Sequence, residues 1–342
     1  LRPALGLAVG AAMAALLAQG GEAQAANAPI SLDLPVDCTP GRTCWISKFV
    51  DLDPGEGVRD YMCNGRANDG HTGVDIALRD RKAMEEGVRV LAAAPGVVKG
   101  TRDGMRDVSV RKDGRESLNG LDCGNGVAIA HDGGWVTQYC HMRRGSIRVR
   151  SGEQVERGQE LGLVGMSGNT EYPHVHVAVR HKGKLFDPFL GLDGRPPASA
   201  GCGPGKVPLW TAAALEALAY TPVAIYNVGF STTPPKAEDM RSGRFRGTEL
   251  PGDAPAILLW AEIFGVEAGD ELRLRLVAPD GTVIVDHKKT LEKRKARWFQ
   301  YAGRKRRGAA WPEGTYRAEV SLARNTGGKT VHVSVTRELE VR

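Results

Sequence analysis

Residues 172–177 read Tyr-Pro-His-Val-His-Val, and this stretch decides how the surrounding sequence is interpreted. The run from Val175 to Val179 has the composition of a β-strand. Side chains in a strand alternate between its two faces, so His174 and His176 project from the same side. One imidazole can then hold a metal ion while the other stays free to transfer a proton.

An earlier stretch can complete a metal site with this pair. Residues 71–75 read His-Thr-Gly-Val-Asp, which supplies one imidazole and one carboxylate. A catalytic zinc ion takes three protein ligands of this mixed type and keeps one coordination position open. The sequence therefore predicts one zinc ion per chain, held by His71, Asp75 and His176.

The sequence between residues 71 and 189 predicts a mainly β, antiparallel domain. Its β-type runs are short and separated by glycine turns. They lie at residues 88–91, 96–98, 126–130, 135–139, 154–155, 161–164 and 175–179, with a further strand expected at 44–50. Only Arg81 to Glu86 has a helical pattern. The long polar segment 101–122 is either a surface loop or a wall of a binding groove.

A second domain is predicted after a linker. Residues 194–208 are rich in Gly, Pro, Ala and Ser, and residues 209–220 have a short amphipathic helical pattern. About seven alternating runs and no helix follow, which is typical of an immunoglobulin-like β-sandwich. We therefore expect a signal segment at 1–25, a first β domain with its lead-in at 26–193, a linker and short helix at 194–220, and a β-sandwich at 221–342.

The first residues have the pattern of a secretory signal. Arg2 precedes an apolar run from Ala4 to Leu17, and Ala23-Gln24-Ala25 offers a cleavage site before Ala26. This run is shorter than a membrane span, and no later segment is long and apolar enough for one. We expect an exported protein, periplasmic or extracellular, with no transmembrane segment.

The six cysteines are expected to form disulfides in an exported protein. They allow fifteen pairings, of which one has a geometric argument. Strands at 126–131 and 135–141 around the turn at 132–134 nearly align Cys123 with Cys140. The partners of Cys38, Cys44, Cys63 and Cys202 stay open.

The chain is basic, with a net charge of +6. An exported basic protein is expected to concentrate near anionic envelope polymers. Residues 288–307 contain ten Lys or Arg, one Glu and the aromatic residues Trp298, Phe299 and Tyr301. This region can bind such a polymer by charge and stacking, or its aromatic residues can face the core of the sandwich, which we slightly favour. No nucleic-acid partner is expected.

Three motifs occur in one β-rich domain: residues 71–75 (HTGVD), residues 139–142 (YCHM) and residues 173–176 (PHVH). In this order the segment 70–189 resembles the lysostaphin/LytM-type zinc metallopeptidases, whose elements are H-x-G-x-D, Y-x-H-[LM] and P-H-[LV]-H. Smaller matches are Gly87-Val88, residues 96–98, residues 123–131, residues 155–168 and Asp187-Pro188. The resemblance covers about a third of the chain.

The resemblance implies that His71, Asp75 and His176 ligate zinc and that His141 and His174 are the catalytic pair. Zinc lowers the pKa of a water to about 7, and histidines near that pH can move protons and stabilise an oxyanion. The roles of the two catalytic histidines stay open. Relatives usually have Phe-Glu where Val177-Ala178 stands, and often Thr-Gly near Glu171-Tyr172, so substrate preference is left open.

The expected function is that of an exported zinc metalloendopeptidase acting on peptide stems or cross-bridges of peptidoglycan. One alternative is a non-catalytic wall-associated protein that regulates or activates another peptidoglycan hydrolase. Such relatives usually lack metal ligands, whereas all five residues of this site are present here. A zinc peptidase acting on proteins is the third candidate.

Overall fold

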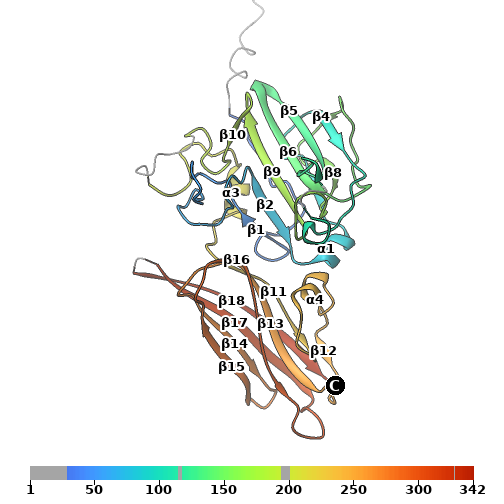
Figure 1. The fold of residues 1–342 in the computed structure, drawn as a ribbon, viewed down its shortest axis with the longest axis vertical. Helices are drawn as coiled ribbons and strands as arrows, with labels where there is room; N and C mark the ends of the chain where they lie inside the picture. Colours follow the sequence, from blue (N-terminus) through green and yellow to red (C-terminus); the bar gives the residue numbers. More distant parts are fainter. Residues whose placement is uncertain (1–28, 115–117, 194–200, 327) are drawn as a thin grey trace, which may run out of the picture.

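The structure is a computed structural model that describes residues 29–114, 118–193, 201–326 and 328–342. Two β-rich bodies lie one above the other along the longest axis (Figure 1). The mainly β, antiparallel class expected from the sequence is confirmed. The expected signal segment lies outside the described residues, and no described helix is long and apolar enough to cross a membrane.

The first body is built on an eight-stranded sheet in the order β1-β2-β9-β6-β5-β4-β7, with β10 paired to β9. A separate ribbon pairs β3 with β8. The strands of the two are β1 (Cys44–Lys48), β2 (Val74–Leu78), β3 (Arg89–Leu91), β4 (Gly96–Arg102), β5 (Asn125–His131), β6 (Trp135–Met142), β7 (Gln154–Val155), β8 (Glu160–Leu163), β9 (His174–His181) and β10 (Lys184–Phe186).

The strand β9 lies between β2 and β6 near the middle of the large sheet. Its alternating pattern explains its place there, because Val175, Val177 and Val179 are almost fully buried in the domain core. His174 and His176 alternate with the first two of these valines along the strand. Both histidines therefore project from the face of β9 opposite the three valines, and β9 is paired with a strand on each side.

Short helices and turns complete the first body. The expected helix is confirmed as α1 (Arg81–Glu86), which begins after Asp80, whose carboxylate caps the backbone N–H of Ala83 at 2.9 Å. The polar segment also forms a helical turn, α2 (Val110–Asp113). A 3-10 turn at Asp132–Gly134 connects β5 to β6.

The segment after the expected linker packs into the first body. Leu209, Trp210 and Leu218 are almost fully buried there, around α3 (Ala212–Ala217). A disulfide between Cys63 and Cys202 ties the start of this segment to the lead-in. Residues 194–200 of the expected linker lie outside the described residues, and the division of the chain into domains stays a prediction.

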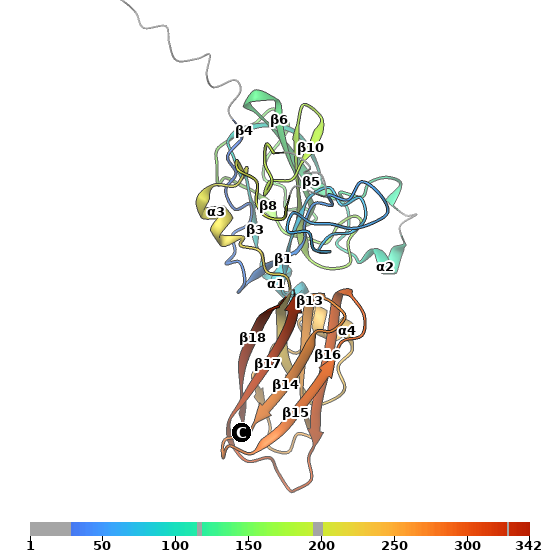
Figure 2. The ribbon, with the colours of Figure 1, turned by 90° about the vertical axis from the view of Figure 1, so that its left-hand side faces the viewer.

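The second body consists of two sheets around one core (Figure 2). One has the order β11-β13-β16 and the other β12-β18-β17-β14-β15. The strands are β11 (Ala224–Ser231), β12 (Glu249–Leu250), β13 (Ala256–Val266), β14 (Glu271–Val277), β15 (Val283–Thr290), β16 (Lys295–Lys305), β17 (Gly314–Thr326) and β18 (Lys329–Val341).

Alternation along β14 shows why this sheet has one buried face. Leu272, Leu274 and Leu276 are fully buried, and the arginines between them point away from the core. The expectation of no helix in this part of the chain is wrong. The helix α4 (Ala237–Ser242) lies between β11 and β12, and Met240 anchors it as a fully buried side chain. Likeness to an immunoglobulin domain stays a prediction.

Apolar and ionic contacts join the two bodies. One cluster combines Trp45, Ala77 and Tyr172 from the first body with Ala224, Tyr226 and Phe264 from the second. Beside α1, the guanidinium of Arg246 donates to Asp80 at 2.7 and 2.8 Å and to Glu86 at 2.7 and 2.9 Å. The second body is therefore held against the edge of the first by both packing and charge.

Candidate metal centre

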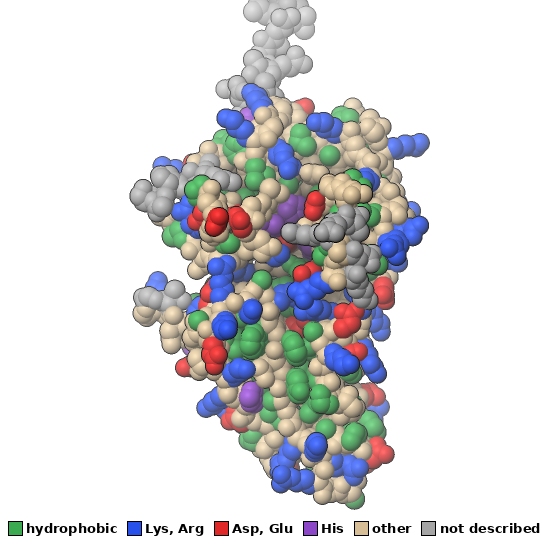
Figure 3. All heavy atoms as spheres, viewed as in Figure 1, with side chains coloured by type: hydrophobic (Ala, Val, Ile, Leu, Met, Phe, Trp, Pro, Cys, Tyr) green, Lys and Arg blue, Asp and Glu red, His purple; other side chains and the backbone are tan. Residues whose placement is uncertain are grey.

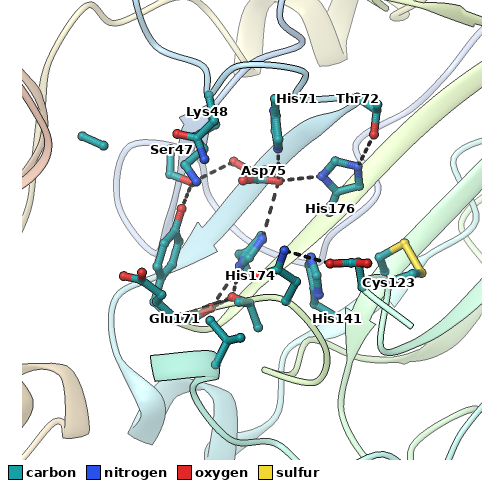
Figure 4. Close-up of a pocket in the computed structure, with 18 of the residues that line it drawn as sticks. Ser47, Lys48, His71, Thr72, Asp75, Cys123, His141, Glu171, His174 and His176 are labelled. Atoms are coloured by element: carbon teal, nitrogen blue, oxygen red, sulfur yellow. Dashed lines mark hydrogen bonds and ion pairs between the residues drawn. A yellow bond between two sulfur atoms is a disulfide. The ribbon is translucent and has the colours of Figure 1, made fainter. Parts of the chain in front are cut away.

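Three potential ligand atoms meet over β2 and β9, on the face of β9 that carries His174 and His176. The Oδ1 atom of Asp75 lies 3.1 Å from Nε2 of His71 and 2.8 Å from Nδ1 of His176. Single donor atoms of the three residues lie within 4.8 Å of one another, as a shared metal ion requires. Figure 4 shows the side chains of His71, His174 and His176 converging on Asp75. The backbone causes this convergence, since Asp75 pairs directly with His176 in the β2–β9 register.

His71 and His176 each make a hydrogen bond on the side of the ring away from Asp75. In each ring the nitrogen that faces Asp75 is therefore free to bind a metal ion. Nδ1 of His71 lies 2.6 Å from the carbonyl oxygen of Phe49, so Nδ1–H donates to it and Nε2 keeps its lone pair. Nε2 of His176 lies 3.4 Å from Oγ1 of Thr72, which leaves Nδ1 facing Asp75. Such outer partners fix the tautomer and orientation of metal ligands. The donor set, two imidazoles and one carboxylate, suits zinc.

A glycine lets the two ligand strands approach closely. A Cβ atom added to Gly73 would lie 2.5 Å from the carbonyl oxygen of Val177 and 2.6 Å from Nε2 of His176. These distances are shorter than van der Waals contact, so a larger residue would displace the imidazole. The middle residue of His71-Thr-Gly-Val-Asp75 is therefore glycine for a steric reason.

Two further histidines lie beside the potential ligands. The ring of His141 is centred 4.6 Å from that of His174, and Nε2 of His174 is 3.5 Å from Oδ1 of Asp75. Nδ1 of His141 lies 2.8 Å from the carbonyl oxygen of Ser167, and Nδ1 of His174 lies 2.9 Å from that of Tyr172. Each Nδ1–H donates to its carbonyl, so each Nε2 can accept a proton.

An irregularity in β6 turns His141 into the site. Asn125 pairs with Met142 and Val127 pairs with Tyr139, so two residues of β6 lie opposite one residue of β5. His141 has a φ of 62°, in the left-handed region that residues other than glycine seldom adopt. A bulge of this kind re-aims one side chain. His141 thereby lies beside His174 at the metal centre.

Burial and neighbouring charges set the protonation of the centre. Burial lowers the pKa of His174 to about 4, and burial with the adjacent imidazoles holds the pKa of His141 well below its usual value. Burial opposes charge on Asp75, but His71, His174 and hydrogen bonds hold the pKa of this carboxyl well below normal. Burial also opposes charge on His71, but Asp75 raises its pKa above normal. Near pH 7, Asp75 is therefore anionic, whereas His141 and His174 are neutral.

The centre lies in a groove of about 810 Å³. Val110, Arg111 and Asp122 line it, so the polar segment 101–122 contributes a wall, one of the two alternatives that the sequence left open. The disulfide expected between Cys123 and Cys140 is confirmed and lies along the same wall. The other two disulfides join Cys38 with Cys44 and Cys63 with Cys202.

The groove has lining residues that the sequence did not identify. Arg241, Phe264, Lys295, Ala296 and Arg297 all belong to the second body. Lys48 of β1 and Arg180 of β9 also line it. Arg180 could have been found from strand periodicity, because it follows His174 and His176 on the same face of β9. The residues of the second body carry no such local signal.

The basic region 288–307 contains the end of β15 and all of β16. Trp298 packs against the sandwich core as expected, but Phe299 and Tyr301 are 39% and 37% exposed. The expectation that the aromatic residues face the core is therefore right for Trp298 and wrong for the other two. Adjacent strand positions point to opposite faces, which explains the difference.

The groove thus holds, on a β-sheet, a group of two histidines and one carboxylate that could bind a metal ion. Residues 69–188, about a third of the chain, match Peptidase family M23. The resemblance to lysostaphin/LytM-type enzymes is thereby confirmed for the first domain.

Curated relatives match a part of the chain. The chain is 37% identical over 75 residues to the cell division protein DipM of Caulobacter vibrioides, covering 20% of this chain and 12% of DipM. It is 32% identical over 114 residues to the peptidoglycan DD-endopeptidase ShyA of Vibrio cholerae, covering 33% of this chain and 21% of ShyA. The chain thus spans about a fifth or less of the length of these two relatives.

Among solved structures, a mutant catalytic domain of the prophage-encoded M23 protein EnpA from Enterococcus faecalis has 25% identity and a TM-score of 0.29. The match covers 41% of this chain and 85% of the EnpA chain. The catalytic domain of lysostaphin from Staphylococcus simulans has 20% identity and a TM-score of 0.27, with the same coverage of 41% and 85%.

Proposed function

We propose that the protein is an exported zinc metalloendopeptidase that hydrolyses peptide bonds in bacterial peptidoglycan. The observation that carries the proposal is the convergence of His71, Asp75 and His176 within 4.8 Å, with His141 and His174 beside them, in an M23 domain. Relatives named as peptidoglycan DD-endopeptidases support the substrate class. Three disulfides support export, since such bonds persist in oxidising compartments.

In the proposed mechanism, His71, Asp75 and His176 hold zinc. When bound, zinc supplies a Lewis acid that polarises the scissile carbonyl and acidifies a water. His141 and His174 are neutral near pH 7, so an Nε2 atom of the pair can accept the proton of the attacking water. The resulting imidazolium then returns the proton to the leaving amine. The carbonyls of Ser167 and Tyr172 hold both rings with Nε2 towards the groove.

The test is hydrolysis of purified peptidoglycan by the full chain, with products identified by mass. Zinc-loaded protein should release peptide fragments, a chelator should abolish release, and zinc should restore it. His141→Ala should retain one zinc per chain and lose about 100-fold or more in kcat, the usual contribution of a proton-transfer residue. Activity that survives both treatments would overturn the mechanism.

The same experiment separates the alternatives. A non-catalytic regulator of another hydrolase would contain about one zinc per chain and release nothing from any wall preparation. A peptidase for proteins would cleave an unstructured polypeptide faster than a cross-linked wall peptide. Product masses also identify the bond that is cut.

A further inference from the structure

We propose that the second body forms a carboxylate-binding subsite at one end of the groove, with Lys295 as its main contact residue. The ligand class is a peptide that carries a free carboxylate next to the bond to be cut. This inference rests on the proposed function and deepens it. It assigns to residues 221–342 a part in substrate recognition.

The second body holds a defined place at the groove. The guanidinium of Arg297 in β16 lies over the ring of Tyr172 at 4.6 Å, and Tyr172 is two residues before His174. Arg297 also donates to the hydroxyl of Tyr226 at 3.1 Å, while Arg294 donates to the carbonyl of Gly65 in the first body. These contacts fix the start of β16 beside the His174 end of β9.

Strand geometry directs Lys295 towards the groove. Lys295 and Arg297 are alternate residues of β16 and therefore share one face of the strand. Arg297 packs against Tyr172 of the first body, so this face looks towards the metal centre. Lys295 lines the groove and is exposed, whereas the side chain of Arg297 is only 12% exposed.

Some charged side chains at this end of the groove have an ion-pair partner and others do not. The buried carboxylate of Glu262 pairs with Arg297 at 3.1 Å and with Arg241 at 3.4 Å. Glu171 pairs with Arg111 at 2.8 Å. Within the part of the chain that the structure describes, Lys48 and Lys295 line the groove without an ion pair to a carboxylate. An anionic substrate group would supply the missing partner.

The surface agrees with this assignment. Figure 3 shows histidine side chains in a hollow of the upper body, with Lys and Arg side chains gathered below it where the two bodies meet. Along β9, Arg180 lies four residues beyond His176 on the same face, roughly 13 Å away, and donates to Gln138 at 3.1 Å. A peptide that extends along the groove therefore passes the metal centre between Arg180 and Lys295.

The test compares two forms of one cross-linked peptidoglycan peptide, one with free carboxylates and one with the carboxylates converted to carboxamides. Calorimetry with the full-length, zinc-loaded His141→Ala protein measures binding without turnover. Binding of the carboxylate form should be about tenfold tighter. Lys295→Gln in this background should remove that preference, and Lys295→Arg should keep it.

The control is Lys305→Gln, which removes one positive charge at the far end of the same strand and should leave both affinities unchanged. Equal binding of the two peptides, or equal effects of Lys295→Gln and Lys305→Gln, would overturn the subsite. In active protein, Lys295→Gln should raise KM for the carboxylate form with kcat unchanged. Unaltered zinc content and melting temperature would show that the variants fold.

The outcome also separates this inference from the proposed function. If wild-type protein hydrolyses neither peptide but binds the carboxylate form through Lys295, the function fails and the subsite stands. If it hydrolyses both forms equally and Lys295→Gln changes nothing, the function stands and the subsite fails.

Discussion

The backbone N–H of His141 donates a hydrogen bond of 2.8 Å to the carbonyl of Cys123, whose sulfur is bonded to Cys140. The disulfide and this hydrogen bond therefore hold the same two stretches of chain together at the bulge in β6, which consists of Cys140 and His141. The left-handed backbone of His141 depends on this local support. The bridge thus fixes the position of a proposed proton-transfer residue.

Removing this bridge should reduce both stability and turnover. Cys123→Ser with Cys140→Ser should lower the free energy of unfolding by about 3 kcal/mol, as expected for a loop with a sequence separation of 17. It should also lower kcat, because His141 loses its fixed orientation, while zinc affinity stays within about threefold. Urea denaturation, steady-state kinetics and zinc titration measure the three effects.

The disulfide between Cys38 and Cys44 provides the control. It closes a shorter loop, with a sequence separation of 6, and neither cysteine lines the groove. Its removal should cost about 2 kcal/mol on the same entropic argument and leave kcat unchanged. If both double variants lowered kcat equally, the special role of the Cys123 bridge would be refuted.

A glycine substitution tests the close packing beneath the metal centre. Gly73→Ala should weaken zinc binding at least tenfold, because the added Cβ would lie 2.6 Å from Nε2 of His176 and displace this ligand. Competition with a chromophoric chelator measures the affinity. Gly100→Ala is a matched control, since Gly100 lies in β4 of the same domain with no atom within 4 Å of the added Cβ. Equal zinc affinities of the two variants would contradict the steric argument.

The sequence predicted the parts of the site that depend on regular strand geometry. His174 and His176 share a face because strand side chains have a period of two, and the β2–β9 register then aligns Asp75 with His176. The same rule would place His141 on the face of Tyr139, which is fully buried in the core. The bulge reverses that placement, and it depends on Cys123 and on pairing with β5. Only the family resemblance indicated His141.

The contribution of the second body to the groove could not be predicted from local sequence. Lys295 and Arg297 are separated from His176 by more than a hundred residues. Their place depends on how two folded bodies pack, which no strand or helix period encodes. The exposure of Phe299 depends on which face of β16 meets the sandwich core, and the sequence pattern in this strand leaves both choices open.

Asp187 should make stability depend on pH. Burial raises the pKa of this carboxyl to about 7, although Oδ1 accepts hydrogen bonds from the backbone N–H groups of Phe189 and Leu190. Its Oδ2 atom is buried without a hydrogen-bond partner among the described residues. The folded chain therefore binds a proton between pH 4 and 7 that the unfolded chain releases.

Because the folded state binds the extra proton, stability falls as pH rises from about 4 to 7. The loss is at most roughly 4 kcal/mol, from about 1.4 kcal/mol for each unit of pKa difference. Asp187→Asn keeps the Oδ1 acceptor without an ionisable group, so it should flatten this dependence and be the more stable form at pH 8. Urea denaturation between pH 4 and 8 measures the pH dependence and the difference in stability. Asp253→Asn, at an exposed carboxylate, is the control. A slope unchanged in Asp187→Asn would assign the pH dependence to other groups.

The ion pairs of Arg246 should couple the docking of the two bodies to substrate binding. The side chain of Asp80 is 1% exposed, so Arg246→Met leaves a buried carboxylate without its counter-charge. Removing one partner of a buried pair costs about 3–5 kcal/mol, and roughly 2–3 kcal/mol is expected here because Arg246 keeps some contact with water. A double-mutant cycle with Asp80→Asn, followed by urea denaturation, isolates this interaction.

The consequence for function follows from the shared groove. If Arg246→Met loosens the second body, Lys295 and Arg297 lose their fixed places, and KM should rise while zinc content stays at one per chain. Arg244→Met is the matched control, because Arg244 pairs with Asp239 within the second body, where a pair of more exposed side chains contributes less than about 1 kcal/mol. A rise in KM for Arg246→Met alone would show that docking orders the groove. An equal rise in both variants would place the effect within the second body and not at its junction with the first.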